Sequence, residues 1–306
     1  AYDVATAVYT NNSFSVASQD GFPKGLAFND TGTKMFVLGS GNDAVYEYAL
    51  STAWDVTTAS YTRLYGVGTR DGNPTGLSFA NSGTKMYIAG YDNDSVYEFT
   101  LSTGFNLSSV TYVGAKSVAT EDATPVGVYV REDGEKIYVL GQSEDEVSEY
   151  DMSTPYAVSS MSLNGQISIT ATVAQPEGLY FKSDGTVMYV TDNNDVFQFN
   201  LSTAWDITTA TFDDSFSTSS QETSLHAAVV EDSGTRMFIV GRSSDTVYEY
   251  DLGSSGAATI TWPSSVDWPS GTEPDDPASG QKDIYSFITP DGGTTYYGFK
   301  SAGNVS

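Results

Sequence analysis

The chain repeats itself with a period of about 51 residues, and this repetition constrains its fold more than any other feature. The phrase LSTAWDVTTA at 50–59 returns almost unchanged as LSTAWDITTA at 201–210. A phrase that recurs at a fixed spacing marks a repeated structural unit. A second phrase shows that five units are present: it reads GTKMFVLG at 32–39, GTKMYIAG at 83–90, GEKIYVLG at 134–141, GTVMYVT at 185–191 and GTRMFIVG at 234–241.

Each unit predicts four short β-strands. In the first unit these are GLAF at 25–28, KMFVL at 34–38, VYEY at 45–48 and ASYTRLY at 59–65. Their residues are β-branched or aromatic, they alternate with period two, and Asp, Asn, Gly and Ser turns separate them. Four strands repeated at this spacing are typical of a β-propeller, in which each blade packs against its neighbours. An open linear array of the same strands is the alternative.

The first residues of the chain favour the closed ring. Residues 1–9, AYDVATAVY, align with AWDVTTASY at 53–61, so they form a fourth strand that has no unit of its own. The fifth unit ends at Leu252 and lacks a fourth strand. Pairing the N-terminal strand with the third strand of that unit, around 247–251, completes the last blade and removes two exposed sheet edges. The sequence thus predicts an all-β fold with a five-bladed β-propeller over residues 1–252.

Basic residues on the second strands and acidic residues on the third strands change together within this one chain. The unit with Val187 in place of a base has Gln198 in place of the acid. In an antiparallel hairpin we expect the two positions to lie directly opposite each other, and a glutamate buried among Val and Tyr needs such a partner. We interpret the pairs as structural, because repeated equivalent sites do not make one active site. The predicted pairs are Lys34–Glu47, Lys85–Glu98, Lys136–Glu149 and Arg236–Glu249.

The charge balance excludes several classes of function. The chain has 13 basic and 39 acidic residues and a net charge of −26, whereas a nucleic-acid-binding protein needs a basic surface. There is no cysteine, so neither a disulfide framework nor a thiolate zinc site can form. No apolar run approaches the roughly 18 residues that span a bilayer, and no signal-peptide pattern is visible. We therefore expect no nucleic-acid partner and no membrane insertion.

Catalytic motifs are missing from the sequence as well. No nucleophile elbow, phosphate-binding loop or metalloprotease motif occurs. The single histidine, His226, starts the innermost strand of the fifth unit near the expected channel mouth, where we interpret it as a structural residue. Carboxylates are so abundant that no two of them stand out as a glycosidase pair. The sequence predicts a protein that is not an enzyme and that has no cofactor.

Acidic residues gather in two sets of loops that a propeller places on one face. One set precedes the inner strand of a unit, and the other lies between its second and third strands. Loops on a rigid scaffold are where recognition usually takes place, although Asp and Asn also favour turns for conformational reasons alone. The segment Asp92-Asn93-Asp94 offers oxygen ligands to calcium but lacks the spacing of a calcium loop, and no other metal site is predicted. The candidate ligand-binding residues are Asp20, Asp43, Asp71, Asp94, Asp122, Asp145, Glu222 and Asp245.

The last residues, 253–306, break the period. GSSGAAT at 253–259 predicts a linker. The turn PDGG at 290–293 joins DIYSFIT to TTYYGFK as a predicted β-hairpin. A two-stranded hairpin is only marginally stable alone, so we expect this segment to dock on a partner or on another copy of the chain. The candidate docking residues are Trp262, Trp268, Tyr285, Phe287, Tyr296, Tyr297 and Phe299.

Part of this segment resembles the C-terminal stretch of tail-fibre and other virion structural proteins of tailed bacteriophages. The matching residues are Trp262-Pro263, Trp268-Pro269 with the following Gly271-Thr272 and Pro274, and Asp291-Gly292-Gly293 through Phe299. The LSTAWDxTTA repeat is similar to repeats of marine phage and environmental surface proteins. The resemblance implies a virion or extracellular protein that displays its propeller towards a host-surface glycan or protein. It also implies that the C-terminal segment binds other virion proteins or copies of itself, and it identifies no receptor-binding residue.

A secreted or cell-surface lectin-like propeller that binds glycans between blades is the alternative. It predicts equivalent pockets in which an aromatic residue recurs. Tyr91 has Ser40, Gln142 and Arg242 as its counterparts, so the loops carry no recurring aromatic residue. The phage assignment is therefore favoured.

Overall fold

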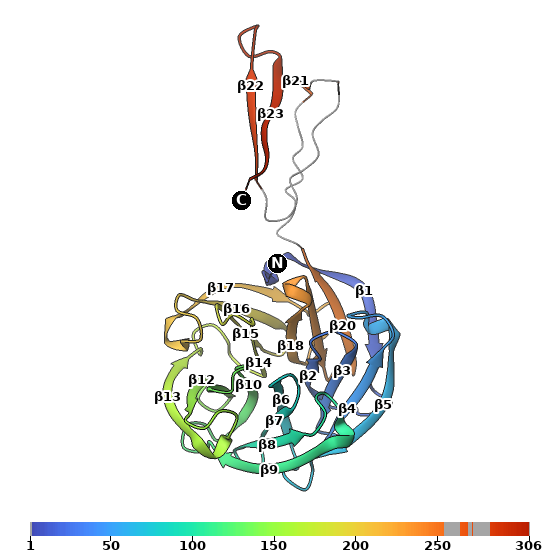
Figure 1. Cartoon of the computed structure of the whole chain (residues 1–306), viewed down its shortest axis with the longest axis vertical. Coiled ribbons are helices and arrows are strands. Elements are labelled where there is room, and N and C mark those ends of the chain that lie inside the picture. The colour runs from blue at the N-terminus through green and yellow to red at the C-terminus, as the bar shows by residue number, and fades with distance from the viewer. Residues whose placement is uncertain (1, 254–263, 269–270, 272–281, 306) are drawn as a thin grey trace. The chain divides into compact units, whose positions relative to one another are not determined.

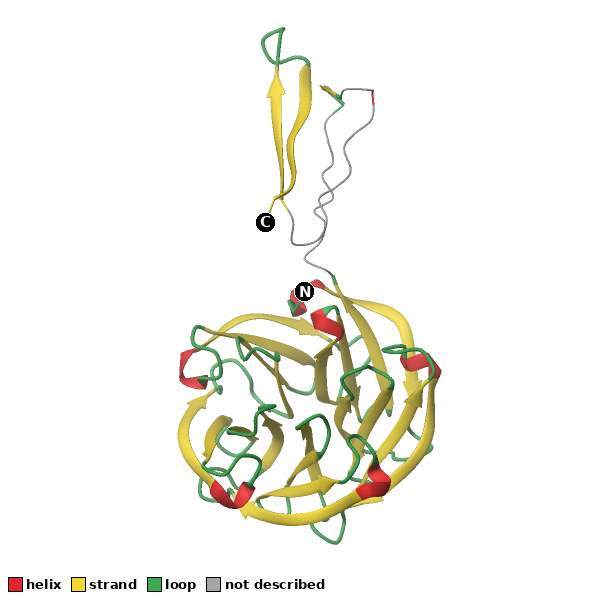
Figure 2. Cartoon of the chain, viewed as in Figure 1, coloured by secondary structure: helices red, strands yellow, loops and turns green. Residues whose placement is uncertain are grey.

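A computed structural model of the chain describes residues 2–253, 264–268, 271 and 282–305. Within these residues the structure is almost entirely β, and helix is confined to short 3₁₀ turns (Figure 2). No helix in the described part of the chain is long and apolar enough to cross a membrane. The chain divides into two compact units, Tyr2–Leu252 and Gly253–Ser306.

The first unit is a ring of five four-stranded antiparallel sheets (Figure 1), so the prediction of a five-bladed β-propeller is confirmed. In blades one to four, neighbouring strands of a sheet follow chain order. Blade one contains β2 (Pro23–Phe28), β3 (Lys34–Gly39), β4 (Ala44–Leu50) and β5 (Ala59–Gly66), and blade two contains β6 (Pro74–Ala80), β7 (Lys85–Gly90), β8 (Ser95–Leu101) and β9 (Val110–Ser117). Blade three contains β10 (Pro125–Val130), β11 (Lys136–Gly141), β12 (Glu146–Met152) and β13 (Met161–Ser168), and blade four contains β14 (Gly178–Phe181), β15 (Val187–Thr191), β16 (Asp195–Leu201) and β17 (Ala210–Ser217).

Blade five closes the ring with the N-terminal strand, as predicted. It contains β18 (Leu225–Glu231), β19 (Arg236–Gly241) and β20 (Thr246–Leu252), with β1 (Ala7–Ser15) as its outermost strand. The register runs from Ala7 opposite Leu252 to Ser15 opposite Thr246, with an irregularity between Tyr9 and Ser13. This pairing covers the edge of β20 that an open array would expose.

The repeated LSTAWD phrase forms a compact turn before the outer strands of blades one and four. Trp54 has a left-handed backbone (φ 64°), and its amide donates to the carbonyl of Gly32 at 2.9 Å. Its ring covers Gly32, where an added Cβ would lie 2.2 Å from the indole, so the turn needs glycine there. The indole also stacks on Phe238 of the preceding blade, with ring centroids 6.3 Å apart. The same turn recurs in all five blades as the 3₁₀ turns η1 (Val4–Thr6), η2 (Val56–Thr58), η3 (Leu107–Ser109), η4 (Val158–Ser160) and η5 (Ile207–Thr209); η6 (Asp232–Gly234) joins β18 to β19.

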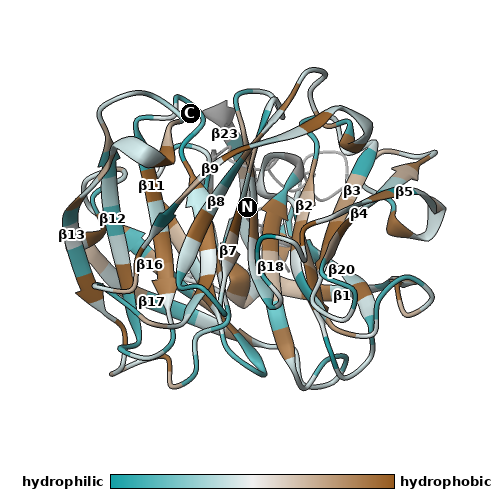
Figure 3. Cartoon of the chain, turned by 90° about the horizontal axis from the view of Figure 1, so that it is seen from below, coloured by the Kyte–Doolittle hydropathy of each residue, from teal (hydrophilic) through white to brown (hydrophobic). Residues whose placement is uncertain are grey.

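The core lies between neighbouring blades rather than at one centre. Leu26, Met35 and Tyr48 of blade one, for example, share a buried cluster with Val229 and Phe238 of blade five. Hydrophobic and hydrophilic bands alternate along the strands (Figure 3), as expected for strands that pack on blades to either side. The inner strands of all five blades are thereby held around one axis.

The second unit is a small three-stranded sheet. β22 (Lys282–Ile288) and β23 (Tyr296–Val305) are antiparallel, which confirms the predicted hairpin, and β21 (Val266–Asp267) adds a short parallel strand. Trp268 is buried, and its ring meets Tyr285 and Phe287 edge-on at centroid distances of 5.8 and 6.0 Å. Tyr297 and Phe299 are exposed, Tyr296 is half-buried, and Trp262 lies outside the described residues.

Candidate functional site

The repeated charge pairs form, but in a different register from the one predicted. Lys34 lies opposite Ala49, and Glu47 lies opposite Phe36, so the two charged residues are diagonal neighbours. The long lysine side chain still reaches the carboxylate, at 2.9 Å in blade one and 2.6 Å for Lys85 and Glu98. The prediction that they lie directly opposite was therefore wrong. The turn at 40–43 sets Gly39 opposite Ala44, and this register places Lys34 two residues away from the position opposite Glu47. The pairs Lys136–Glu149 and Arg236–Glu249 form in the same way.

The second carboxylate oxygen of each pair links one blade to the next. Glu47 Oε2 accepts a hydrogen bond at 3.1 Å from the amide of Leu107, which begins the 3₁₀ turn of blade two. In blade four Gln198 keeps this role, since its Oε1 accepts from the amide of Val4 at 3.1 Å. The glutamates are therefore structural, with every oxygen used within the ring. The corresponding bonds elsewhere are Val158 N to Glu98 and Ile207 N to Glu149.

Four of the eight predicted ligand-binding acids are buried, and their carboxylates connect neighbouring loops by accepting hydrogen bonds from backbone amides. Asp20 is 2% exposed and accepts hydrogen bonds from the amides of Phe22 (2.8 Å), Gly41 (3.0 Å) and Asn42 (2.9 Å). It thus ties the segment before β2 to the turn between β3 and β4. A ligand on the loop face would not reach these carboxylates. Asp71, Asp122 and Glu222 are buried and hold the turns of blades two, three and five in the same way.

The other four acids occupy turn positions with a left-handed backbone. Asp43 has φ 49°, and its carbonyl accepts a hydrogen bond from the amide of Val67 at 2.7 Å. Asp and Asn tolerate this conformation better than most residues, which explains their recurrence without a ligand. Burial of the carboxyl groups raises the pKa of Asp43 and of Asp245. Asp94, Asp145 and Asp245 are equivalent, and all four side chains are partly exposed.

The candidate calcium segment makes hydrogen bonds within the propeller. Among the described residues, no three His, Asp or Glu side chains come together as a metal-binding group. In the candidate calcium segment, the Asn93 side chain donates to the carbonyl of Arg70 and to Asp71 at 3.1 Å.

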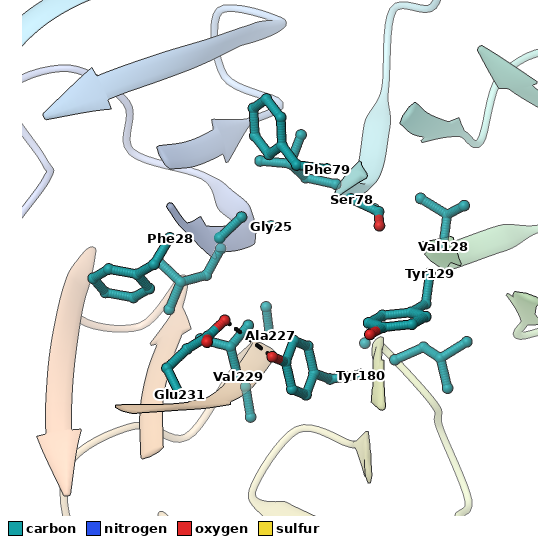
Figure 4. Close-up of a pocket in the computed structure, with 18 of the residues that line it drawn as sticks. Gly25, Phe28, Ser78, Phe79, Val128, Tyr129, Tyr180, Ala227, Val229 and Glu231 are labelled. Carbon is teal, nitrogen blue, oxygen red and sulfur yellow. Dashed lines mark hydrogen bonds between the residues drawn. The ribbon is translucent and has the colours of Figure 1, made fainter. Parts of the chain in front are cut away.

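The inner strands β2, β6, β10, β14 and β18 surround a cavity of about 790 Å³ (Figure 4). Pockets of about 300–1,000 Å³ are the usual size of small-molecule sites. Equivalent positions of the five strands face this cavity, so a residue that departs from the repeat can be recognised by comparison with its four counterparts. Two groups of polar residues stand out in this comparison.

The first group lies where the inner strands begin. The His226 Nδ1 lies 2.8 Å from Glu177 Oε2, and Lys24 Nζ lies 3.4 Å from the same nitrogen. Their counterparts in the remaining blades are Thr75 and Val126. Burial lowers the pKa of Lys24 and of His226. Burial acts to raise the pKa of Glu177, but its hydrogen bond with His226 and the nearby positive charge lower that pKa overall. His226 is buried at the start of β18, the innermost strand of blade five.

The second group lies where β18 ends. The Tyr180 hydroxyl donates to Glu231 Oε1 at 3.0 Å, and the ring of Tyr129 meets that of Tyr180 edge-on with centroids 5.6 Å apart (Figure 4). Burial raises the pKa of Glu231 to about 7, against the opposing effect of the Tyr180 hydrogen bond. Our reading of the sequence missed these residues. Comparison of equivalent inner-strand positions could have found them. The counterparts of the two tyrosines in the other blades are smaller, and the counterparts of Glu231 carry no carboxylate.

Comparisons with known proteins bear on the fold. No protein-family model matches the chain, and no curated protein matches it. It is similar in structure to Kuenenia stuttgartiensis hydrazine synthase, with 14% identity, 73% of this chain and 56% of that chain covered, and a TM-score of 0.46. It is also similar to a putative 6-phosphogluconolactonase from Bacteroides uniformis (12% identity, 74% and 65% covered, TM-score 0.44). A third similar structure is the β-propeller domain of Cps50 (Swd1) from Myceliophteria thermophila (13% identity, 75% and 65% covered, TM-score 0.43). The chain spans 56% to 65% of the length of these three chains, and the likeness concerns the fold alone.

Proposed function

We propose that this protein is a non-enzymatic component of a phage particle, in which the propeller is displayed outwards and the C-terminal unit attaches the chain. The proposal rests on the resemblance of the C-terminal residues to phage virion proteins together with the surface of that unit. Its partners are other virion proteins or copies of itself, and its location is the virion exterior. The displayed propeller meets a host-surface glycan or protein.

The exposed apolar side chains of the C-terminal sheet carry the proposal. Ile288 is 62% exposed, and Tyr297, directly opposite it on β23, is 43% exposed. Phe299 is also exposed and follows Tyr297 on the same face. A small sheet with an apolar face exposed to water is poorly stable alone. Such a face gains stability when a second copy or another particle protein covers it.

The propeller supports a non-enzymatic role for a different reason. Its repeated glutamates form ion pairs and accept hydrogen bonds within the ring, and half of its loop acids accept hydrogen bonds there too. These carboxylates are therefore not available for substrate chemistry. For the same reason those buried acids cannot serve as repeated glycan-binding groups. This weakens the lectin alternative, although the four partly exposed aspartates still recur from blade to blade.

Light scattering on the full chain and on a chain ending at Leu252 tests the proposal. We expect the full chain to form a symmetric multimer, most simply a trimer, and the truncated propeller to be folded and monomeric. The double variant Ile288→Ser with Tyr297→Ser should weaken association, whereas Leu163→Ser, which removes an exposed residue from the propeller, should not. Monomeric behaviour of the full chain combined with binding of glycans at several equivalent sites would overturn the virion assignment in favour of the lectin.

A further inference from the structure

The wall of the central cavity departs from the fivefold repeat on one side. Tyr129 and Tyr180 occupy a position that is Ala27, Ser78 or Val229 in the other three blades. These residues all line the cavity. Bulky tyrosines on two neighbouring inner strands are not needed to build a blade, since three blades form without them.

A carboxylate faces the same side of the cavity without a cation. In blades three and four the position of Glu231 is occupied by the bases Arg131 and Lys182. Each of these bases pairs with acids of its own loop and not with Glu231. Arg131 lies 2.6 Å from Asp133 and from Glu135, and Lys182 lies 2.6 Å from Asp184. Arg236, directly opposite Glu231 on β19, pairs with Glu249 instead. No ion pair to Glu231 occurs among the described residues, and its hydrogen bond comes from the Tyr180 hydroxyl. A desolvated carboxylate in this state gains strongly from a cation that enters the cavity.

The surrounding charge also favours a cation. Asp30 and Glu132 line the cavity together with Glu231, and the chain as a whole carries a net charge of −26. The other charged residues of the wall are Asp133, Glu177, Lys24 and Arg131, so five acids stand against two bases. This excess of negative charge concentrates cations in the cavity. Tyrosine ring faces attract ammonium groups in addition.

We propose that the central cavity binds a primary amine, whose ammonium group pairs with Glu231 beside the rings of Tyr129 and Tyr180. The apolar body of the ligand lies against wall residues such as Val128 and Val229. The cavity volume of about 790 Å³ accommodates a small aromatic or aliphatic amine. This inference concerns the propeller alone and does not depend on the virion role.

Titration calorimetry with phenethylamine tests the site, and 2-phenylethanol serves as the neutral ligand of similar shape. At pH 8 in phosphate buffer and moderate salt, we expect the amine to bind one site about tenfold or more tightly than the alcohol. Glu231→Gln, which keeps an acceptor for Tyr180, should reduce amine affinity about tenfold or more while leaving alcohol binding unchanged. Glu144→Gln removes the same charge from an exposed loop and should change neither affinity.

Proton release gives a second measurement. At pH 6.5 the amine must displace a proton from part of the Glu231 population, so the binding heat should differ between phosphate and MOPS buffers. The difference should vanish in Glu231→Gln. If that variant does not fold, Tyr129→Leu, which removes one ring face and no charge, should still weaken amine binding several-fold. Equal affinity for amine and alcohol, or unchanged amine affinity in folded Glu231→Gln, would overturn the proposal.

Discussion

At the scale of single residues, two positions share the task of joining neighbouring blades. In blades two, three and four the hydroxyls of Tyr87, Tyr138 and Tyr189 donate to the carbonyl of the aromatic turn residue in the next blade, at 2.7 to 2.8 Å. Blades one and five have phenylalanine there, and the basic residue two positions earlier donates instead. Lys34 Nζ reaches Phe105 O at 2.6 Å, and Arg236 reaches Trp54 O at 3.0 Å. Each of these turn carbonyls thus has a donor, as a partly buried acceptor requires.

The Lys85–Glu98 pair allows a double-mutant test of the charge pairs. Lys85→Val alone leaves Glu98, which is buried, without its cation and should cost about 3 kcal/mol of unfolding free energy. Adding Glu98→Gln copies the arrangement of blade four, where Gln198 still accepts the hydrogen bond from the next blade. The double variant should therefore recover most of the loss in urea denaturation. Strictly additive effects would contradict a direct interaction between the two side chains.

Glu231 should make stability depend on pH. Its pKa rises from the ordinary 4.5 to about 7 on folding, so the unfolded chain loses this proton at a lower pH than the folded one. Below about pH 4.5 the residue is neutral in both states and has no effect; between pH 4.5 and 7 the stability falls as the pH rises. Glu231→Gln should therefore be more stable than the wild type at pH 8, by at most about 3 kcal/mol, and equal to it below pH 4.5. A stability difference that does not change with pH would contradict this assignment.

At the scale of elements, β1 determines whether the ring is closed. Deleting residues 2–15 removes this strand and exposes the edge of β20 (Thr246–Leu252). We expect a large fall in melting temperature together with aggregation, because an unpaired edge recruits other chains. A synthetic peptide of residues 2–15 added in trans should restore much of the melting temperature, whereas a peptide with the same residues in scrambled order should not. An unchanged melting temperature after the deletion would show that the ring does not need this strand.

At the scale of the whole molecule, the excess of negative charge opposes the compact state. The net charge of −26 remains after all 13 basic residues are balanced against 13 of the 39 acidic ones. Salt screens repulsion between exposed charges beyond a Debye length of about 10 Å at 0.1 M. Raising NaCl from about 0.01 M to about 0.5 M should therefore raise the melting temperature, and KCl should act alike because screening does not depend on the ion. A fall in melting temperature would mean that the ion pairs contribute more than the repulsion.

The sequence by itself determined the number of blades, their strands and the closure of the ring by the N-terminal strand. These features follow from local patterns, namely period-two alternation, turn residues and a repeat whose missing strand stands at the other end of the chain. Tertiary structure decided how side chains meet: that Lys34 reaches Glu47 diagonally, and that Asp20 is buried under its own turn. It also decided that Tyr180 and Glu231, which lie on different blades, share one hydrogen bond. Such contacts depend on which residues the closed ring brings to its axis, and no local pattern specifies that arrangement.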